Sequence, residues 1–205
     1  MIKVENVEVM GWENAIRGAR NPFNSWHRMD SFFVGDNTIL GPNDYKLLTK
    51  LANAGSDHGK FMRMIVVYMD ITAPLYWYKE FDTYKIGTVA NSCSTMHKIH
   101  DKELTLDDFS CERLSPRRRD ILRTYIEEIN YARKEYLETK EKSYWDEMIQ
   151  MLPSSYNQRR TVMLNYEVLK NMYHARKNHK LYEWVDLCRW IETLPYSELI
   201  TGGKK

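Results

Sequence analysis

The sequence predicts an α+β fold in which a single domain holds a mixed sheet packed with long helices. Segments with the alternating or β-branched pattern of strands and segments with the period of amphipathic helices occur in the same chain. The 205 residues suffice for one sizeable domain with a buried core. No repeat, low-complexity segment or long linker divides them. We therefore expect one domain over residues 1–200 and a flexible tail over residues 201–205.

The first half of the chain predicts two strands and three helices. Apolar residues alternate over residues 2–9 with one slip, and β-branched and apolar residues crowd residues 62–71, which indicates a strand in each place. Helices are expected where a start signal precedes a helical pattern and a breaker follows it. The three expected helices cover residues 11–19 before Asn21-Pro22, residues 42–54 between Gly41-Pro42 and Gly55, and residues from Ala73-Pro74 to about Tyr84.

The second half of the chain is expected to be mainly helical. Residues 87–95 are small and polar, which is typical of a loop or a short strand. Ser115-Pro116 is a good helix start, and an apolar stripe follows it. The elements expected from there on are a long amphipathic helix at 115–137, a helix at 145–152, a short strand at 160–164, a helix with Asn171 and Arg176, and a last helix at 181–191.

Composition narrows the class of protein and its compartment. A formal net charge of +2 argues against a dedicated nucleic-acid binder, which usually carries a basic excess. No apolar run approaches the length of a membrane span, and the charged N-terminus is unlike a secretory signal. The three cysteines are scattered and odd in number, so we expect no disulfide framework and a cytoplasmic protein. The 14 Tyr and 6 Trp indicate an aromatic core or a cleft that stacks a planar ligand.

One segment near the C-terminus combines side chains that suit a phosphorylated ligand. Leu152-Pro153 leads into an apolar segment that ends at Asn165, and a helix then carries Asn171 and Arg176. Helical spacing is expected to bring Asn171 and Arg176 to neighbouring parts of one surface, where a carboxamide and a guanidinium suit a nucleotide. The order and spacing of these residues resemble, without a gap, the C-terminal signature of the flavin-dependent (alternative) thymidylate synthases.

A second segment, residues 61–97, resembles the central motifs of the same family. An apolar strand leads to Ala73-Pro74 and a helix, and Thr83-Tyr84-Lys85 stands where the family has Arg-His-Arg. Residues 91–94, Asn-Ser-Cys-Ser, resemble the family's Asn-Glu-x-Ser if one residue is inserted. Without the insertion, Cys93 takes the place of the serine. Further positions differ from the family. Glu80 replaces a glutamine, and Asn165-Tyr166-Glu167 replaces Asn-x-Arg with a reversed charge. Two family arginines are also absent: Met96 or Thr95 stands after the serine, and Ile149-Gln150 stands before the Leu-Pro pair.

The resemblance implies an enzyme that transfers a one-carbon unit from methylenetetrahydrofolate to a pyrimidine deoxynucleotide monophosphate. It implies FAD as the cofactor, NADPH as the source of electrons, and a homotetramer whose active sites are shared between subunits. No nucleic acid and no membrane is expected as a partner. The resemblance assigns Ser94 as a catalytic residue and Arg176 and Glu80 as substrate-binding residues. The cofactor-binding residues that it implies are Thr83, Tyr84, Lys85, Asn91, Asn165 and Asn171.

Structural interpretations and other functions stay open. Ser94, Thr88 and Asn91 also suit turns and caps, and Lys85 also suits the C-terminal end of a helix. Arg176 could form a surface ion pair. The same fold could carry a different nucleotide modification, or it could serve as a nucleotide-binding or structural oligomer that has lost flavin and catalysis.

Two further clusters have a functional alternative. Cys93, His97 and His100, with Asp101 adjacent, have a spacing that could place ligands on one zinc ion, although a polar surface segment explains the spacing equally well and we assign no metal. The run Arg117-Arg118-Arg119 suits a solvated helix face or contact with phosphate.

Overall fold

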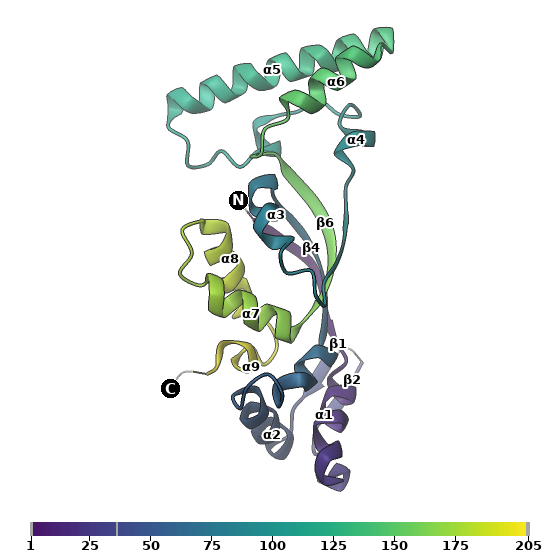
Figure 1. Ribbon diagram of the computed structural model, residues 1–205, viewed down its shortest axis with the longest axis vertical. Coiled ribbons are helices and arrows are strands. Elements are labelled where there is room, and N and C mark those ends of the chain that lie inside the picture. Colours follow the sequence, from purple (N-terminus) through teal and green to yellow (C-terminus); the bar gives the residue numbers. More distant parts are fainter. Residues whose placement is uncertain (1, 36, 204–205) are drawn as a thin grey trace. The chain divides into compact units, whose positions relative to one another are not determined.

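The computed structural model describes residues 2–35 and 37–203 and has an α+β fold (Figure 1). Its main sheet has four strands in the order β1-β4-β6-β5, so strands far apart in the sequence are neighbours. A separate sheet pairs β2 with β3 in antiparallel register, with Phe32 opposite Ile39. The strands are β1 (Lys3–Met10), β2 (Phe32–Val34), β3 (Asn37–Ile39), β4 (Val66–Pro74), β5 (Val89–Ser92) and β6 (Asn157–Asn165).

The contacts of the chain divide it into two compact units. Unit 1 consists mainly of Ile71–Thr83 and Asn91–Arg160. Unit 2 consists of Val4–Asp70, Tyr84–Ala90 and the described residues from Thr161 onward. The boundary passes through each of the four strands of the main sheet, so every one of these strands contributes residues to both units.

Unit 1 is dominated by two helices that lie side by side, α5 (Pro116–Thr139) and α6 (Lys142–Met151) (Figure 1). Between them Lys140 has a left-handed backbone (φ 60°) and donates its N–H to the Tyr136 carbonyl at 2.9 Å, which ends α5. The other helices of unit 1 are α3 (Leu75–Phe81), α4 (Thr95–Lys98) and the 3-10 helix η4 (Leu106–Asp108). The apolar core of α5 and α6 consists of Ile99, Leu104, Phe109, Ile126, Ile129, Ala132 and Met148.

Unit 2 surrounds its own apolar core with helices from both ends of the chain. Trp12 meets the rings of Tyr166 and Tyr196 edge-on at centroid distances of 5.3 and 5.2 Å. The helices are α1 (Trp12–Arg20), α2 (Pro42–Ala52), α7 (Tyr166–Arg176), α8 (Tyr182–Ile191), α9 (Glu198–Thr201), and the 3-10 helices η1 (Asn21–Phe23), η2 (Trp26–Arg28) and η3 (Gly59–Met64). No helix among residues 2–35 and 37–203 combines the length and the apolarity that a bilayer crossing requires.

Most of the expected elements are present, and several boundaries need correction. The slip expected in the first strand corresponds to Asn6, whose φ of 49° is left-handed. The strand expected at residues 62–71 begins only at Val66, because Met62 and Met64 belong to η3, in which Met62 is buried and Met64 is exposed. Strand β4 continues through Pro74, and α3 ends at Phe81 rather than near Tyr84. Apolar pattern alone does not separate a buried 3-10 turn from a buried strand.

The β2–β3 hairpin and the short helices α4 and α9 were not expected from the sequence. Phe32 and Ile39 of the hairpin are 69% and 58% exposed, so no buried face marks these strands. The expected tail at residues 201–205 lies partly outside the described residues. Within them, Thr201 ends α9 and Gly202 closes it with a φ of 91°.

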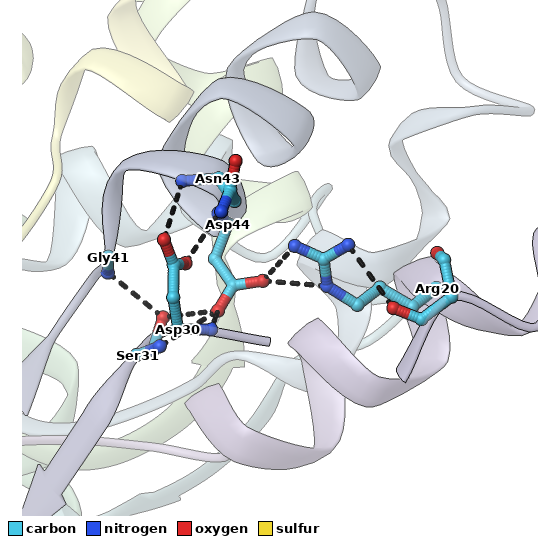
Figure 2. A network of polar contacts seen from close by, with 7 residues as sticks. Arg20, Asp30, Ser31, Gly41, Asn43 and Asp44 are labelled. Carbon is cyan, nitrogen blue, oxygen red and sulfur yellow. Dashed lines mark hydrogen bonds and ion pairs between the residues drawn. The ribbon is translucent and has the colours of Figure 1, made fainter. Parts of the chain in front are cut away.

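A buried ion pair joins α1 to α2 in unit 2 (Figure 2). Arg20, 3% exposed, donates from Nε and Nη2 to Oδ1 of Asp44 at 2.7 and 2.5 Å. Oδ2 of Asp44 accepts from the N–H groups of Asp30 and Ser31, each at 3.0 Å, and from the Ser31 hydroxyl at 2.6 Å. Asp30 in turn accepts from the N–H of Asn43 at 2.9 Å and from that of Asp44 at 3.0 Å, which satisfies the first turn of α2.

The Asp44 carboxylate is expected to stabilise the fold only above acidic pH. Burial raises the pKa of the Asp44 carboxyl. Hydrogen bonds from Ser31 and Asp30 and the Arg20 guanidinium lower it by a larger amount, so the pKa of Asp44 lies below the ordinary value. A carboxyl whose pKa is lower in the folded state than in the unfolded state stabilises the fold at pH values above its unfolded pKa. This stabilisation is lost as the pH falls through the pKa of the folded state. Urea unfolding of the wild type and Asp44→Ala should show a difference that is constant at neutral pH and shrinks below about pH 4. A difference independent of pH down to acid unfolding would contradict this.

Candidate functional site

The loop at Tyr84 and the end of α7 are in contact within unit 2. Arg176 donates from Nε to the Tyr84 hydroxyl at 3.0 Å. Its guanidinium carbon lies 5.7 Å from the centroid of the Tyr84 ring and 4.9 Å from that of Trp184, which is fully buried. Nη1 of Arg176 lies 3.1 Å from Nε2 of His179. The two segments selected from the sequence, separated by 92 residues, therefore meet at Tyr84 and Arg176.

The same loop also contacts the beginning of α7. Asn165 is the N-cap, and its Oδ1 accepts the N–H of Val168 at 3.1 Å. Gly87 has a φ of +77°, and a Cβ placed on it would lie 3.0 Å from Nδ2 of Asn165. The loop from Tyr84 to Gly87 therefore contacts both ends of α7. Tyr84 accepts a hydrogen bond from Arg176 at the C-terminal end, and the Gly87 backbone approaches Asn165 closely at the N-terminal end.

Asn171 faces a different environment from Arg176. Five residues of α-helix correspond to a rotation of roughly 140° between the two side chains, so they do not share one face. Asn171 is exposed and lines a cavity of about 270 Å³ in unit 2. The residues that line this cavity are Ala52, Asn53, Gly55, Ser56, Gly59, Met62, Glu167, Lys170 and Asn171. The structure therefore pairs Arg176 with Tyr84 and places Asn171 at a separate polar cavity.

Two cations that the sequence did not single out lie at this cavity or beside it. Lys170 lines it and donates from Nζ to the Ala52 carbonyl, and burial lowers the pKa of its amine. Arg63 forms a two-pronged ion pair with Glu167, from Nε at 2.5 Å and from Nη2 at 3.0 Å. Glu167 is the position at which the charge is reversed relative to the Asn-x-Arg pattern. Glu167 is thus neutralised by Arg63, a residue 104 positions away, which no local sequence signal reveals.

The ion pair of Arg63 with Glu167 is expected to set the anion affinity of the cavity. Arg63→Gln leaves the Glu167 carboxylate unpaired and should weaken binding of an anionic nucleotide about threefold to tenfold, whereas Glu167→Gln frees the Arg63 guanidinium and should strengthen it by a similar factor. Titration with ADP or FAD at low salt measures both affinities. Glu13→Gln, an exposed change on α1, serves as the control. Changes of the same sign in the two variants would refute a role of this pair in anion binding.

Four of the candidate residues belong to unit 1, and the structure gives two of them local roles. The Thr83 hydroxyl donates to the carbonyl of Glu80 at 2.7 Å in the turn after α3. Ser94 is the N-cap of α4 and accepts the N–H of His97 at 3.1 Å. Asn91 is exposed on β5. The contact of Ser94 matches its interpretation as a cap, and ligand roles for Glu80, Thr83, Asn91 and Ser94 stay predictions.

Arg160 of β6 is a further cation that the sequence did not single out. It pairs from Nη1 with Asp82 at 2.7 Å, and its guanidinium carbon lies 3.7 Å from the centroid of the Tyr78 ring. Its Nε donates to Oε1 of Gln158 at 3.0 Å, and Nε2 of Gln158 donates to the Cys93 carbonyl at 2.8 Å. Arg160 thus fixes the end of α3 to the sheet within unit 1.

Three other features that the sequence analysis named, Lys85, Thr88 and the arginine run at residues 117–119, take no part in the contacts described above. Lys85 is exposed, and Oγ1 of Thr88 is buried without a hydrogen-bond partner among the described residues. Arg117, Arg118 and Arg119 form the exposed first turn of α5. No group of three or more His, Cys, Asp or Glu side chains in the described parts of the chain is placed to hold a metal ion.

Sequence comparison gives no match, whereas comparison of folds gives clear ones. No protein-family profile matches the chain, and no curated protein sequence matches it. A crystal structure of flavin-dependent thymidylate synthase ThyX from Helicobacter pylori, complexed with FAD and dUMP, is similar over 95% of this chain and 96% of that chain, with a TM-score of 0.72 and 16% identity. A second Helicobacter pylori ThyX structure with FAD and dUMP covers 97% and 95%, with a TM-score of 0.75 and 15% identity.

A nucleotide-modifying enzyme of a different name shares the fold as well. The UMP/dUMP methylase PolB from Streptomyces cacaoi, bound with 5-Br dUMP, is similar over 98% of this chain and 95% of that chain. Its TM-score is 0.64 and its identity is 15%. The chain therefore has the α+β fold of the flavin-dependent thymidylate synthases over nearly its whole length.

Proposed function

We propose that the protein is a flavin-dependent enzyme that transfers a one-carbon unit to a pyrimidine deoxynucleotide monophosphate, with dUMP as the first candidate. The observation that carries this proposal is the fold shared over 95% of the chain with an enzyme complexed with FAD and dUMP. In this scheme FAD supplies the redox chemistry and NADPH the electrons, while methylenetetrahydrofolate supplies the carbon. The protein then needs to bind, orient and polarise, and it needs no covalent nucleophile.

The side chains of unit 2 fit a dinucleotide cofactor in part. The cavity beside α7 is lined by Lys170 and Asn171 and adjoins Arg63, a donor set that suits phosphate oxygens. Its volume of about 270 Å³ is small for a whole dinucleotide. We therefore propose that Asn171 and Lys170 hold a phosphate-bearing part of FAD, and that another subunit of a homotetramer covers the remainder.

The loop that spans α7 is proposed to complete the nucleotide site. Tyr84 offers a ring for stacking, Lys85 an exposed ammonium, and Arg176 a guanidinium already oriented by Tyr84 and Trp184. We assign Arg176 to the substrate phosphate and Tyr84, Lys85 and Asn165 to the cofactor. The roles that the resemblance implies for four further residues stay predictions: catalysis for Ser94, substrate binding for Glu80, and cofactor binding for Thr83 and Asn91. Three free cysteines fit the proposed reducing cytoplasm.

A spectrum and thermal unfolding test the proposal. The purified protein, alone or after addition of FAD, should show the flavin absorption bands, and FAD and dUMP should each raise the midpoint temperature, because a ligand selective for the folded state stabilises it. Riboflavin, which lacks the phosphates, should stabilise less than FAD at equal concentration. A protein that gains neither absorbance nor stability with FAD would refute the flavin assignment.

The similarity to a UMP/dUMP methylase supports one alternative, namely another pyrimidine nucleotide as substrate. Thermal unfolding with dUMP, UMP and dCMP separates the two possibilities. Stabilisation by dUMP above the others supports the thymidylate synthase assignment. Preference for UMP or dCMP assigns the same site to a different nucleotide modification.

A further inference from the structure

A cavity of about 340 Å³, called the α4–α6 cavity below, lies within unit 1 where α5 gives way to α6 beside α4. Trp145 of α6 donates its indole N–H to the Met96 carbonyl of α4 at 3.2 Å, which joins the two helices. The ring of His100 meets that of Tyr136 edge-on at a centroid distance of 5.1 Å. These four residues line the cavity together with His97, Lys140 and Lys142. None of them is assigned to FAD or to the pyrimidine nucleotide.

Aromatic rings orient both lysines of the α4–α6 cavity. Nζ of Lys140 lies 5.7 Å from the centroid of the Tyr136 ring, and Nζ of Lys142 lies 6.0 Å from that of Trp145. Lys142 also lies 3.5 Å from a carboxylate oxygen of Asp146 one turn along α6. Contacts of this kind restrict long side chains before a ligand arrives, so less conformational entropy is lost when an anion binds to them.

The α4–α6 cavity has donors that the protein itself does not use. The nearby carboxylate of Asp101 pairs with Lys98 at 2.7 Å and lies 3.5 Å from Nε2 of His100. Within residues 2–35 and 37–203, Lys140 forms no ion pair and the ring of His97 forms no hydrogen bond. An ammonium carries three donors and a neutral imidazole carries one, so these two side chains offer positive charge and N–H groups to a ligand.

We propose that the α4–α6 cavity binds a small molecule that bears a dianionic phosphate, through Lys140, Lys142 and His97. Ammonium groups bind phosphate as point charges, whereas the planar guanidinium fork is the better match for a carboxylate. A volume of about 340 Å³ lies at the lower end of the roughly 300–1,000 Å³ of small-molecule sites, which fits a compact phosphorylated molecule rather than a dinucleotide. The site is independent of flavin and of the proposed reaction.

Lysine acetylation mapped by peptide mass spectrometry tests where the phosphate binds. Without FAD or dUMP, ribose 5-phosphate should slow acetylation of Lys140 and Lys142 about threefold or more relative to sodium chloride of equal ionic strength, because the bound phosphate covers both ammonium groups. Lys134, exposed on α5 outside the cavity, is the internal control and should react at an unchanged rate. Ribose should protect neither lysine. Protection at lower concentrations of ribose 5-phosphate than of inorganic phosphate assigns a phosphorylated metabolite, and the reverse order assigns free phosphate.

Substitutions show whether the lysines act on one ligand. Lys140→Gln should raise the concentration of ribose 5-phosphate that half-protects Lys142 about tenfold, and His97→Gln should raise it about threefold. Lys134→Gln is the matched control and should leave this concentration unchanged, while unfolding curves confirm that each variant folds. The proposal is overturned by equal protection of Lys134, by protection from ribose alone, or by protection of Lys142 that is indifferent to Lys140→Gln. None of these results bears on the spectral and thermal tests with FAD and dUMP, since those tests involve no residue of the cavity.

Discussion

Replacement of Asp44 with Ala is expected to destabilise unit 2 by about 3–5 kcal/mol, because it leaves the buried Arg20 guanidinium without its counter-ion. The same change removes the acceptor for the Ser31 hydroxyl and for two backbone N–H groups. Urea unfolding followed by circular dichroism measures the loss, which should also lower the midpoint temperature by about 10 °C.

The control for Asp44→Ala is an ion pair on the surface of the same unit. Asp186 pairs with Arg189 at 3.1 Å one turn along α8, and their side chains are 40% and 73% exposed. Asp186→Ala should change stability by less than about 1 kcal/mol, since water screens an exposed pair. Equal losses in Asp44→Ala and Asp186→Ala would show that the Arg20–Asp44 network contributes little.

Removal of the Arg176 guanidinium is expected to reduce strongly the stabilisation by deoxynucleotide monophosphates. A hydrogen bond to a charged group contributes about 1.5–3 kcal/mol, so Arg176→Ala should weaken dUMP binding roughly tenfold to a hundredfold. The fold should persist with a small loss of stability, because the contacts with the Tyr84 and Trp184 rings are also removed. Thermal unfolding over a dUMP concentration series separates the loss of dUMP affinity from the loss of stability of the unliganded protein.

Two variants distinguish a phosphate role from a structural one. Arg176→Lys keeps the charge but loses the planar fork, and it should bind dUMP with intermediate affinity. Arg189→Ala removes an exposed arginine of α8 and should respond to dUMP like the wild type. If wild type and Arg176→Ala respond equally to dUMP, the phosphate assignment is wrong even when both fold normally.

Local patterns in the sequence were sufficient for the elements with strong boundaries. Ser115-Pro116 marks the start of α5, and the helix with Asn171 and Arg176 is present as α7. The exposed β2–β3 hairpin lacks an apolar face, so its strands carry no comparable signal. The residues before Val66 include Phe61, Met62 and Ile65, and such an apolar content does not separate a 3-10 turn from a strand.

The candidate site shows a similar division between local and long-range information. The sequence identified Tyr84 and Arg176, and the structure brings them into contact. Arg63 and Lys170 were missed because their partners, Glu167 and the Ala52 carbonyl, lie in other segments: 104 residues separate Arg63 from Glu167, and 118 separate Lys170 from Ala52. Asn171 was expected beside Arg176, but the rotation between helix positions five residues apart directs it to the cavity lined by Lys170.

Release of tritium from dUMP labelled at C5 tests the proposed reaction most directly, since adding a one-carbon unit at C5 replaces that hydrogen. The protein supplied with FAD, NADPH and methylenetetrahydrofolate should release tritium into water, and omission of either FAD or methylenetetrahydrofolate should stop the release. Protein that has bound FAD and dUMP, as shown by its spectrum and its thermal shift, yet releases no tritium with all cosubstrates present would contradict the proposed activity.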